Sequence, residues 1–518
     1  MRIQQARRER GWGWNGEDDA CFVAASHLLE PGRTWYSGGP YAYGISLGTW
    51  KRFLSGKAAI NAHAFKAYCQ VLGLDWEEVV DRHSDCGGGG SRQDWDESID
   101  GSQFYGRVEE LAQLGQWVGC DRCRLIILSG MGGIGKTLLS VKFAEQLESQ
   151  FEFVLRRSLR RAPSLSELLH ECNTVLGQPP ATPPNDPLGH LLDTLRQYRC
   201  LLILDDVETI LCSGQLAGQY QLNYQDYHDL FRRLGQESHQ SCVVVITREK
   251  LRELTSLTGH NLPVRDFQLG GLDLNAAKQV LAIKGFDISA RGTHDFIQLY
   301  RGHPLALKLM ANTIREIFGG HIDEFLSQST LVLGDIMPGI FYQQLQRLSE
   351  SESIIINWIA LANRPITLRQ LRQYLRFSTL STSQIVAALE SLKRRSLLEV
   401  IPSDVGSLCF SLEPVLIKYI IGQLIEKLCH EIEQFTKYRT LSDQSALRIY
   451  CLVENPQQAP ETARPWIINK LTNQLLFSTT TPEDFNKTLK ALQHQLQMKP
   501  SQEVGYCLTN LACLFPTE

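Results

Sequence analysis

The stretch from Arg124 to Leu139, RLIILSGMGGIGKTLL, constrains the fold of this chain more strongly than any other. Leu125 to Ser129 is short, apolar and rich in Ile and Leu, which predicts a buried strand. The eight residues after it have the spacing G-x-x-x-x-G-K-[ST], and an apolar period typical of a sheet-packed helix follows directly. A strand, a glycine loop and a helix in this order predict a parallel α/β sheet with a phosphate-binding loop.

Each residue type in this loop has a physical reason for its place. Glycine lets the backbone curl so that successive N–H groups point at phosphate oxygens, and the following helix N-terminus favours anions. We expect Lys136 to reach the β- and γ-phosphates of a nucleoside triphosphate and Thr137 to supply a hydroxyl ligand for Mg²⁺. The expected binding residues are Gly130, Met131, Gly132, Gly133, Ile134, Gly135, Lys136, Thr137 and Leu138.

Composition is that of a globular protein rather than a membrane-spanning one. The 518 residues suffice for roughly three or four domains, and 43% are apolar. The net charge of −4 excludes a general polyanion binder, so any nucleic-acid surface has to be local. The N-terminus lacks the apolar segment of a secretory signal, and no apolar run is long enough to cross a membrane. The 14 cysteines include one C-x-x-C without a second pair, which favours reduced thiols in a cytoplasmic protein over zinc.

Residues 1–82 predict a small all-α domain. The helix expected over Ile45 to Leu54, with Ser46 as its N-cap, resembles the recognition helix of a phage-repressor helix-turn-helix. In that interpretation Lys51, Arg52 and Lys57 would face phosphates or base edges of DNA. Residues 1–80 carry nine Lys and Arg against eight Asp and Glu, so no basic field supports it. A helical adaptor that contacts a protein effector is the alternative.

A flexible linker is expected over 83–103, which contains four consecutive glycines. From 104 to 270 the chain alternates short apolar runs with helical patterns, as a nucleotide-binding α/β domain does. Beyond this, 271–340 reads as a helical domain. Three helices and a hairpin about residues 402–406 predict a winged helix at 341–424, and amphipathic helices predict a helical segment at 425–518.

Two further strands of the predicted sheet end in charged residues. LLIL at 201–204 is followed by Asp205, which would hold Mg²⁺ through water, and Asp206, which could orient or deprotonate the attacking water. Paired acids at this place can also be turn formers or helix caps. CVVVI at 242–246 is followed by Thr247 and Arg248, and a cation there can reach a γ-phosphate. The alternative for Arg248 is an ion pair with a surface acid.

Six motifs in order resemble the NB-ARC (AP-ATPase) type of signal-transduction ATPases with numerous domains (STAND), a family of P-loop NTPases related to AAA+ ATPases. These motifs are FYGR at 104–107, the phosphate loop, LLILDDV at 201–207, Thr247-Arg248, GGL at 270–272 and GHPLAL at 302–307. The resemblance implies a nucleotide domain, a helical domain and a winged helix that close around ADP and open with ATP and Mg²⁺. It also implies that Arg107 touches the nucleotide, that Pro304 packs near the adenine and that Arg248 senses the γ-phosphate.

The same resemblance implies a slow Mg²⁺-dependent ATPase that works as a switch and forms homo-oligomers on activation. Many family members contact ADP through a His at the end of the winged helix, whereas this chain has Phe410 to Pro414, FSLEP, at that place. Members usually end in a WD40 or TPR sensor; about ninety residues follow the winged helix here, so we expect a sensor lost or supplied by a separate protein. The alternatives are a DNA-binding transcription regulator whose oligomeric state is set by ATP and, least favoured, a metabolic kinase or motor ATPase.

Overall fold

The computed structural model of this chain divides into two compact units, residues 1–90 with 95–100 and residues 91–94 with 101–518. Each unit is described by itself. The described residues are 6–8, 20–39, 41–42, 45–55, 62–74, 92–95, 104–176, 186–289, 291–327, 337–402, 406–438, 445–452, 465–478 and 482–514.

The first unit is helical in its described part, as predicted, with α2 (Ala20–Leu29), α3 (Leu47–Ser55) and α4 (Ala62–Leu72). Trp50 is buried among aromatic rings, and its centroid lies 5.1 Å from that of Tyr68. Ser46 caps α3 as expected, because its hydroxyl accepts the Thr49 N–H at 3.1 Å. Lys51 is exposed. Lys57 lies outside the described residues, as do 75–82. A DNA-binding role for α3 stays a prediction.

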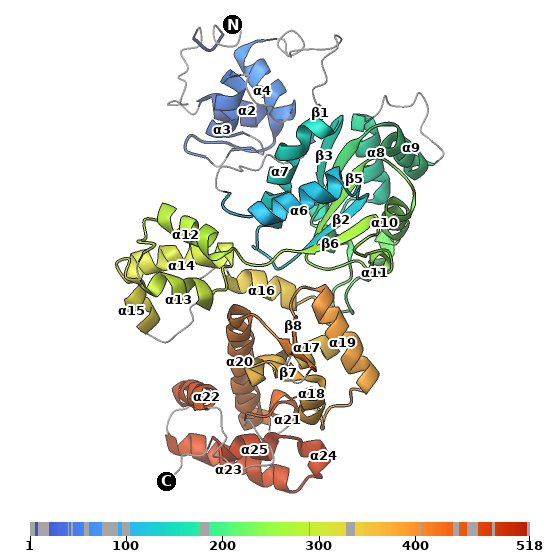
Figure 1. Ribbon diagram of the computed structural model, residues 1–518. Coiled ribbons are helices and arrows are strands. Elements are labelled where there is room, and N and C mark those ends of the chain that lie inside the picture. The colour runs from blue at the N-terminus through green and yellow to red at the C-terminus, as the bar shows by residue number, and fades with distance from the viewer. Residues whose placement is uncertain are drawn as a thin grey trace. The chain divides into compact units, whose positions relative to one another are not determined.

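The second unit contains a six-stranded sheet in the order β1-β3-β4-β5-β2-β6 (Figure 1). The pairs from β3 to β6 are parallel. The strands are β1 (Arg92–Trp95), β2 (Leu125–Ser129), β3 (Phe153–Ser158), β4 (Cys200–Asp205), β5 (Cys242–Thr247) and β6 (Val264–Gln268). The strands predicted from apolar runs at 125–129, 201–204 and 242–246 are confirmed. The carboxyl ends of β2, β4 and β5 meet at one edge of the sheet, where parallel sheets bind ligands.

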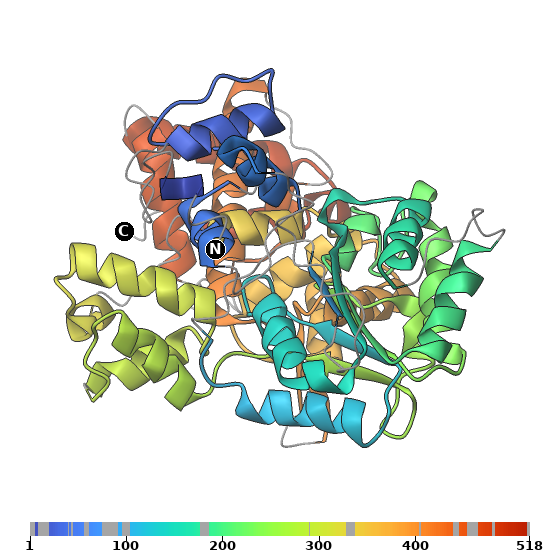
Figure 2. The same cartoon turned by 90° about the horizontal axis from the view of Figure 1, so that it is seen from above.

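Helices cover both faces of this sheet (Figure 2). Apolar residues of α8 (Leu165–Leu176), α9 (Pro187–Gln197) and α10 (Asp226–Gln236) share one core with β2 to β5. On the other face lies α7 (Lys136–Leu147), which follows the phosphate loop and packs beside α6 (Val108–Gly119). The first helix after the loop is therefore held by the sheet.

Helices dominate the chain after β6. The first group is α12 (Leu274–Ile283), α13 (Arg291–Leu299), α14 (Pro304–Ile317) and α15 (Ile322–Ser327). It is followed by α16 (Met337–Leu345), α17 (Glu350–Ala362), α18 (Leu368–Tyr374) and α19 (Thr382–Arg394). Capping boxes fix the starts of α17, α18 and α19, since Ser349, Thr367 and Ser381 each exchange hydrogen bonds with the Glu or Gln three residues later.

A small antiparallel sheet accompanies these three helices. The predicted hairpin is formed by β8 (Glu399–Pro402) and β9 (Leu408–Ser411), with Val400 opposite Phe410. The strand β7 (Ile366–Thr367) pairs with the other side of β9. The three helices and the hairpin predicted for 341–424 are therefore present.

The C-terminal segment is helical, as predicted. It comprises α20 (Pro414–Tyr438), α21 (Ala446–Ile449), α22 (Pro465–Ser478), α23 (Pro482–Gln497), α24 (Ser501–Val504) and α25 (Cys507–Ala512). Tyr506 joins it to the preceding helices, because its ring packs on Trp358 and its hydroxyl donates to the Tyr374 carbonyl at 2.9 Å. Among the described residues, no helix is long and apolar enough to cross a membrane.

One expectation from the sequence changes, and one strand was not predicted. The strand β1 lies within 83–103, the stretch expected to be a flexible linker, and Asp94 in it forms an ion pair with Arg157 of β3. The strand β6 carries no apolar run, because Arg265 and Asp266 interrupt it. The division of the chain into six regions stays a prediction.

Replacement of Asn510 by Ala should destabilise the C-terminal helices. The buried Asn510 amide accepts the Leu452 N–H at 2.8 Å and donates to the carbonyls of Leu447 and Tyr450. Three backbone groups would lose their partner in a closed environment, so we expect a loss of about 3 kcal/mol in urea unfolding. Asn473→Ala on the exposed face of α22 is the control, and an equal effect of both substitutions would contradict this assignment.

Candidate functional site

The phosphate loop has the backbone that a phosphate site requires. Gly130 and Gly133 have φ values of +155° and +81°, and a Cβ atom would lie 2.8 Å from the Leu269 oxygen at Gly130 and 2.7 Å from Leu305 Cδ2 at Gly133. Gly135, the N-cap of α7, offers no side-chain cap to the helix amides. A helix N-terminus without a side-chain cap suits an anion, and the role of this one in phosphate binding stays a prediction.

Lys136 is folded back over the loop. Its Nζ donates to the carbonyls of Gly130 at 2.8 Å and Met131 at 3.0 Å. Burial lowers the pKa of Lys136 to about 8, the Arg248 charge adds to this, and Glu208, Asp205 and Asp206 act against it. The ammonium group therefore lacks a full counter-charge in this state, and a phosphate would supply one.

Thr137 and Asp205, the two predicted Mg²⁺ ligands, lie together. Thr137 Oγ1 donates to Asp205 Oδ2 at 2.9 Å, and Asp205 Oδ1 accepts the Asp206 N–H at 2.9 Å. The described residues contain no cluster of three or more His, Cys, Asp or Glu that could hold a metal by itself. One carboxylate and one hydroxyl fit Mg²⁺, which binds through few protein oxygens together with substrate phosphates.

Asp206 lies beside this pair in a left-handed conformation, with φ at 57°. Its Oδ2 accepts the Ser158 hydroxyl at 3.1 Å. Burial raises the pKa of Asp206, and the neighbouring charges of Asp205 and Glu208 raise it further. A raised pKa suits the predicted task of orienting or deprotonating water, because a carboxylate with a higher pKa is a better base.

Arg248 adjoins the loop and pairs with an acid. A Cβ atom on Gly132 would lie 3.3 Å from Arg248 Nη1, so the guanidinium lies against the phosphate loop. Arg248 Nε forms an ion pair with Glu208 Oε1 at 3.0 Å, and the Arg248 N–H donates to Glu208 Oε2. The partner is a largely buried acid of the site rather than a surface acid. Glu208 was missed by the sequence reasoning, although it stands three residues after Asp205.

Arg107 is buried against backbone carbonyls. Its Nη2 donates to Gly270 O at 2.7 Å and Ile134 O at 3.2 Å, and its Nη1 donates to Gly271 O at 3.1 Å. Its Nη1 also pairs with Glu110. These bonds join the phosphate loop to the segment before α12. The guanidinium that was expected to touch the nucleotide is engaged by the protein in this state.

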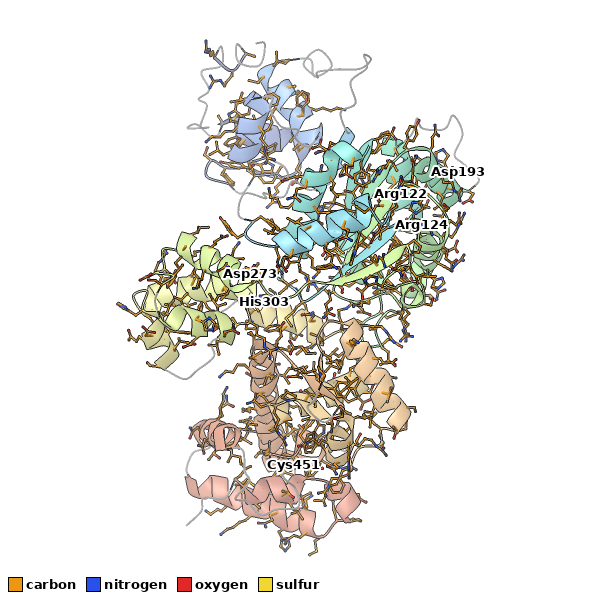
Figure 3. All side chains as sticks on the ribbon, viewed as in Figure 1. Arg122, Arg124, Asp193, Asp273, His303 and Cys451 are labelled. Carbon is orange, nitrogen blue, oxygen red and sulfur yellow. The ribbon has the colours of Figure 1, made fainter. Side chains whose placement is uncertain are left out.

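His303, labelled in Figure 3, is the N-cap of α14 and contacts the phosphate loop at Gly132. Its Nδ1 accepts the Ala306 N–H at 3.3 Å, so the proton is on Nε2, which faces the Gly132 carbonyl at 3.2 Å. Burial lowers the pKa of His303 to about 4. Pro304, predicted near the adenine, is the first residue of α14, and Leu305 packs on Gly133. The sequence motif predicted a role for Pro304 and none for His303.

The sequence of residues 120–255 matches the AAA domain family. That range holds the phosphate loop, Asp205 and Arg248. This part of the chain has the α/β fold of a P-loop NTPase, and its sequence is similar to AAA domains. The chain is also 36% identical over 572 aligned positions to an uncharacterized WD repeat-containing protein of Nostoc sp., an alignment that covers 98% of this chain and 44% of that protein. It therefore spans less than half of that relative.

Two solved structures resemble the chain more distantly. A STAND protein with a tetratricopeptide repeat sensor from Pyrococcus horikoshii has 15% identity and a TM-score of 0.32, covering 79% of this chain and 56% of that one. Cdc6p from Pyrobaculum aerophilum has 16% identity and a TM-score of 0.30, covering 63% of this chain and 99% of that one.

His303 should make the stability of the second unit sensitive to acid. Because its folded pKa of about 4 is below the ordinary value, the folded state binds fewer protons, and stability is lost as pH falls from about 6.5 towards 4. Between pH 7 and pH 5, the free energy of unfolding measured in urea should fall by about 2 kcal/mol less in His303→Asn than in the wild type. This substitution keeps an N-cap for α14. His294→Asn on the exposed face of α13 should keep the loss, and the same pH dependence in both variants would contradict the assignment.

Proposed function

We propose that this chain is a nucleotide-dependent molecular switch of the NB-ARC STAND type, closed with ADP and open with ATP and Mg²⁺. The observation that carries the proposal is the pair of adjacent residues after β5. Arg248 faces the phosphate loop, whereas Glu249 enters a buried ion network with the helices α17 and α19. A change at the terminal phosphate would thus pass through Arg248 and Glu249 to another part of the second unit.

Glu249 is 1% exposed, and its carboxylate takes partners from several segments. Its Oε2 accepts from Arg395 Nη1 at 2.6 Å and from Arg347 Nη2 at 3.2 Å. Its Oε1 accepts the Gly218 N–H at 2.6 Å. A buried carboxylate is stable only with such partners, and loss of one partner of a buried pair typically costs about 3–5 kcal/mol.

Arg395 joins the nucleotide-binding region to α17. It is 3% exposed, its Nε donates to Glu352 Oε1 at 2.9 Å and its Nη2 donates to the Gln215 carbonyl at 2.6 Å. Ser391 also donates to Glu352 and accepts the Ala217 N–H, both at 2.6 Å. We define Glu249, Arg395, Glu352 and Ser391 as the latch. It offers a closed-state contact that does not need the family's His, absent from Phe410 to Pro414.

In the proposed cycle, Arg248 exchanges Glu208 for the terminal phosphate and Lys136 leaves its two carbonyls for the phosphates. Thr137 and Asp205 would hold Mg²⁺, which neutralises developing charge, and Asp206 would orient the water for slow hydrolysis. Reversal of a two-state population from about 1:99 to 99:1 needs roughly 5.5 kcal/mol. Charge-assisted hydrogen bonds contribute about 1.5–3 kcal/mol each, so new bonds at Lys136 and Arg248 would supply much of this difference, less the contribution of the bonds to Glu208 and to the loop carbonyls that are broken.

The proposal extends to partners. Activation would produce a homo-oligomer in the cytoplasm, and residues 1–82 would contact a protein effector. The WD repeats named in the Nostoc relative support a sensor that acts with this region, within a longer chain or as a separate protein. Transcription regulation through DNA contacts of Lys51 and Arg52 is the alternative, supported by the exposure of Lys51 on α3.

Size-exclusion chromatography with ADP and with a non-hydrolysable ATP analogue tests the switch. We expect a monomer with ADP and a larger species with the analogue, and no larger species for Lys136→Ala because the phosphates lose their cation. Arg395→Met should release the latch and favour the larger species even with ADP. Arg394→Met, one residue away with its side chain on Glu390, is the control. Monomeric profiles throughout would contradict the switch.

A further inference from the structure

A buried arginine of β3 reaches the carboxylate expected to bind Mg²⁺. Arg156 is 1% exposed and pairs in the sheet with Ile203 of β4, while Ser158 pairs with Asp205. Arg156 and Ser158 therefore point to the same face of the sheet. Arg156 Nη2 lies 2.8 Å from Asp205 Oδ2, and Ser158 bonds to Asp206.

One oxygen of Asp205 thus serves two donors. Asp205 Oδ2 accepts from Arg156 Nη2 and from Thr137 Oγ1, while Oδ1 accepts the Asp206 N–H. The Arg156 guanidinium contributes a fixed positive charge. The carboxylate expected to attract the hydrated metal is already compensated by a fixed positive charge.

Arg156 contributes one of the positive charges near the end of β4. Lys136, Arg156 and Arg248 lie near Asp205, Asp206 and Glu208, and Arg160 also acts on Asp206. Without Arg156 the Asp205 carboxylate would lose its ion-pair partner, and its negative charge would repel a nucleotide phosphate unless Mg²⁺ lay beside it. With Arg156 in place, the phosphates meet a site in which the Asp205 carboxylate is paired with a cation.

We propose that Arg156 is a positioning residue that holds Asp205 in the absence of Mg²⁺ and makes ADP binding independent of the metal. The inference rests on the proposed nucleotide site and adds how that site is regulated. Arg156 would retain ADP without metal and weaken the hold on Mg²⁺, because a fixed cation repels the ion from the same carboxylate. Addition of Mg²⁺ would then raise the affinity for ATP less than in a site without this arginine.

Titration of the full chain with a fluorescent ADP analogue, in EDTA and at increasing Mg²⁺, tests this role. For the wild type we expect affinities in EDTA and in saturating Mg²⁺ that agree within about threefold. In Arg156→Gln, which keeps a donor but loses the charge, the affinity in EDTA should fall by about tenfold and Mg²⁺ should restore it. Arg156→Lys, which keeps the charge, should behave like the wild type.

Arg157→Gln is the matched control, since the neighbouring arginine pairs with Asp94 and Glu171 away from the phosphate loop. Equal metal dependence in Arg156→Gln, Arg157→Gln and the wild type would overturn the inference while the nucleotide site stands. A wild type that binds the analogue only with Mg²⁺ would overturn it even if Arg156→Gln failed to fold. Absence of binding by the wild type in both conditions would refute the nucleotide site as well.

Discussion

The buried carboxylate of Glu249 requires a cation, and this requirement organises the second unit. A charge that is 1% exposed cannot be solvated by water, so it is stable only while Arg395 and Arg347 reach it. Arg395 in turn requires Glu352 of α17. Because Glu249 follows Arg248 directly, the element that touches the phosphate loop also anchors the helices after β6. Packing of side chains alone would not make the segment at the phosphate loop and the helices after β6 depend on the same buried charge.

The same principle governs the phosphate loop. Lys136 is held by two carbonyls, Arg248 by Glu208 and Asp205 by Arg156. Each charged group that a nucleotide or Mg²⁺ would use is occupied by a protein partner in this state. Binding is therefore an exchange of partners, and its free energy is the difference between the hydrogen bonds that form to phosphate and those that break within the protein. A site of this kind is suited to reporting which nucleotide it holds.

The sequence predicted the strands and site residues that are determined by local patterns. An apolar run followed by a glycine loop located β2 and Lys136, and apolar runs that end in charged residues located Asp205 and Arg248. Two strands were missed, β6 because Arg265 and Asp266 break its pattern and β1 because it is short and lies beside a glycine run.

Partners distant in sequence were beyond such patterns. Arg156 and Asp205 are 49 residues apart, and Arg395 and Glu249 are 146 apart, so only the fold brings them together. His303 occupies the variable position of its motif, and no periodicity distinguishes it. Glu208 could have been predicted from the sequence, because it is a third acidic residue close after Asp205 and Asp206. The roles of the predicted site residues are proposals that the geometry supports.

Hydrogen exchange of the Ala217 and Gly218 amides tests the central claim most directly, because these amides donate to Ser391 and Glu249 of the latch. Peptides covering both residues would be followed by mass spectrometry with ADP and with a non-hydrolysable ATP analogue, each at saturation. We expect slow exchange with ADP and clearly faster exchange with the analogue. Equal protection with both nucleotides, when both are bound, would contradict it.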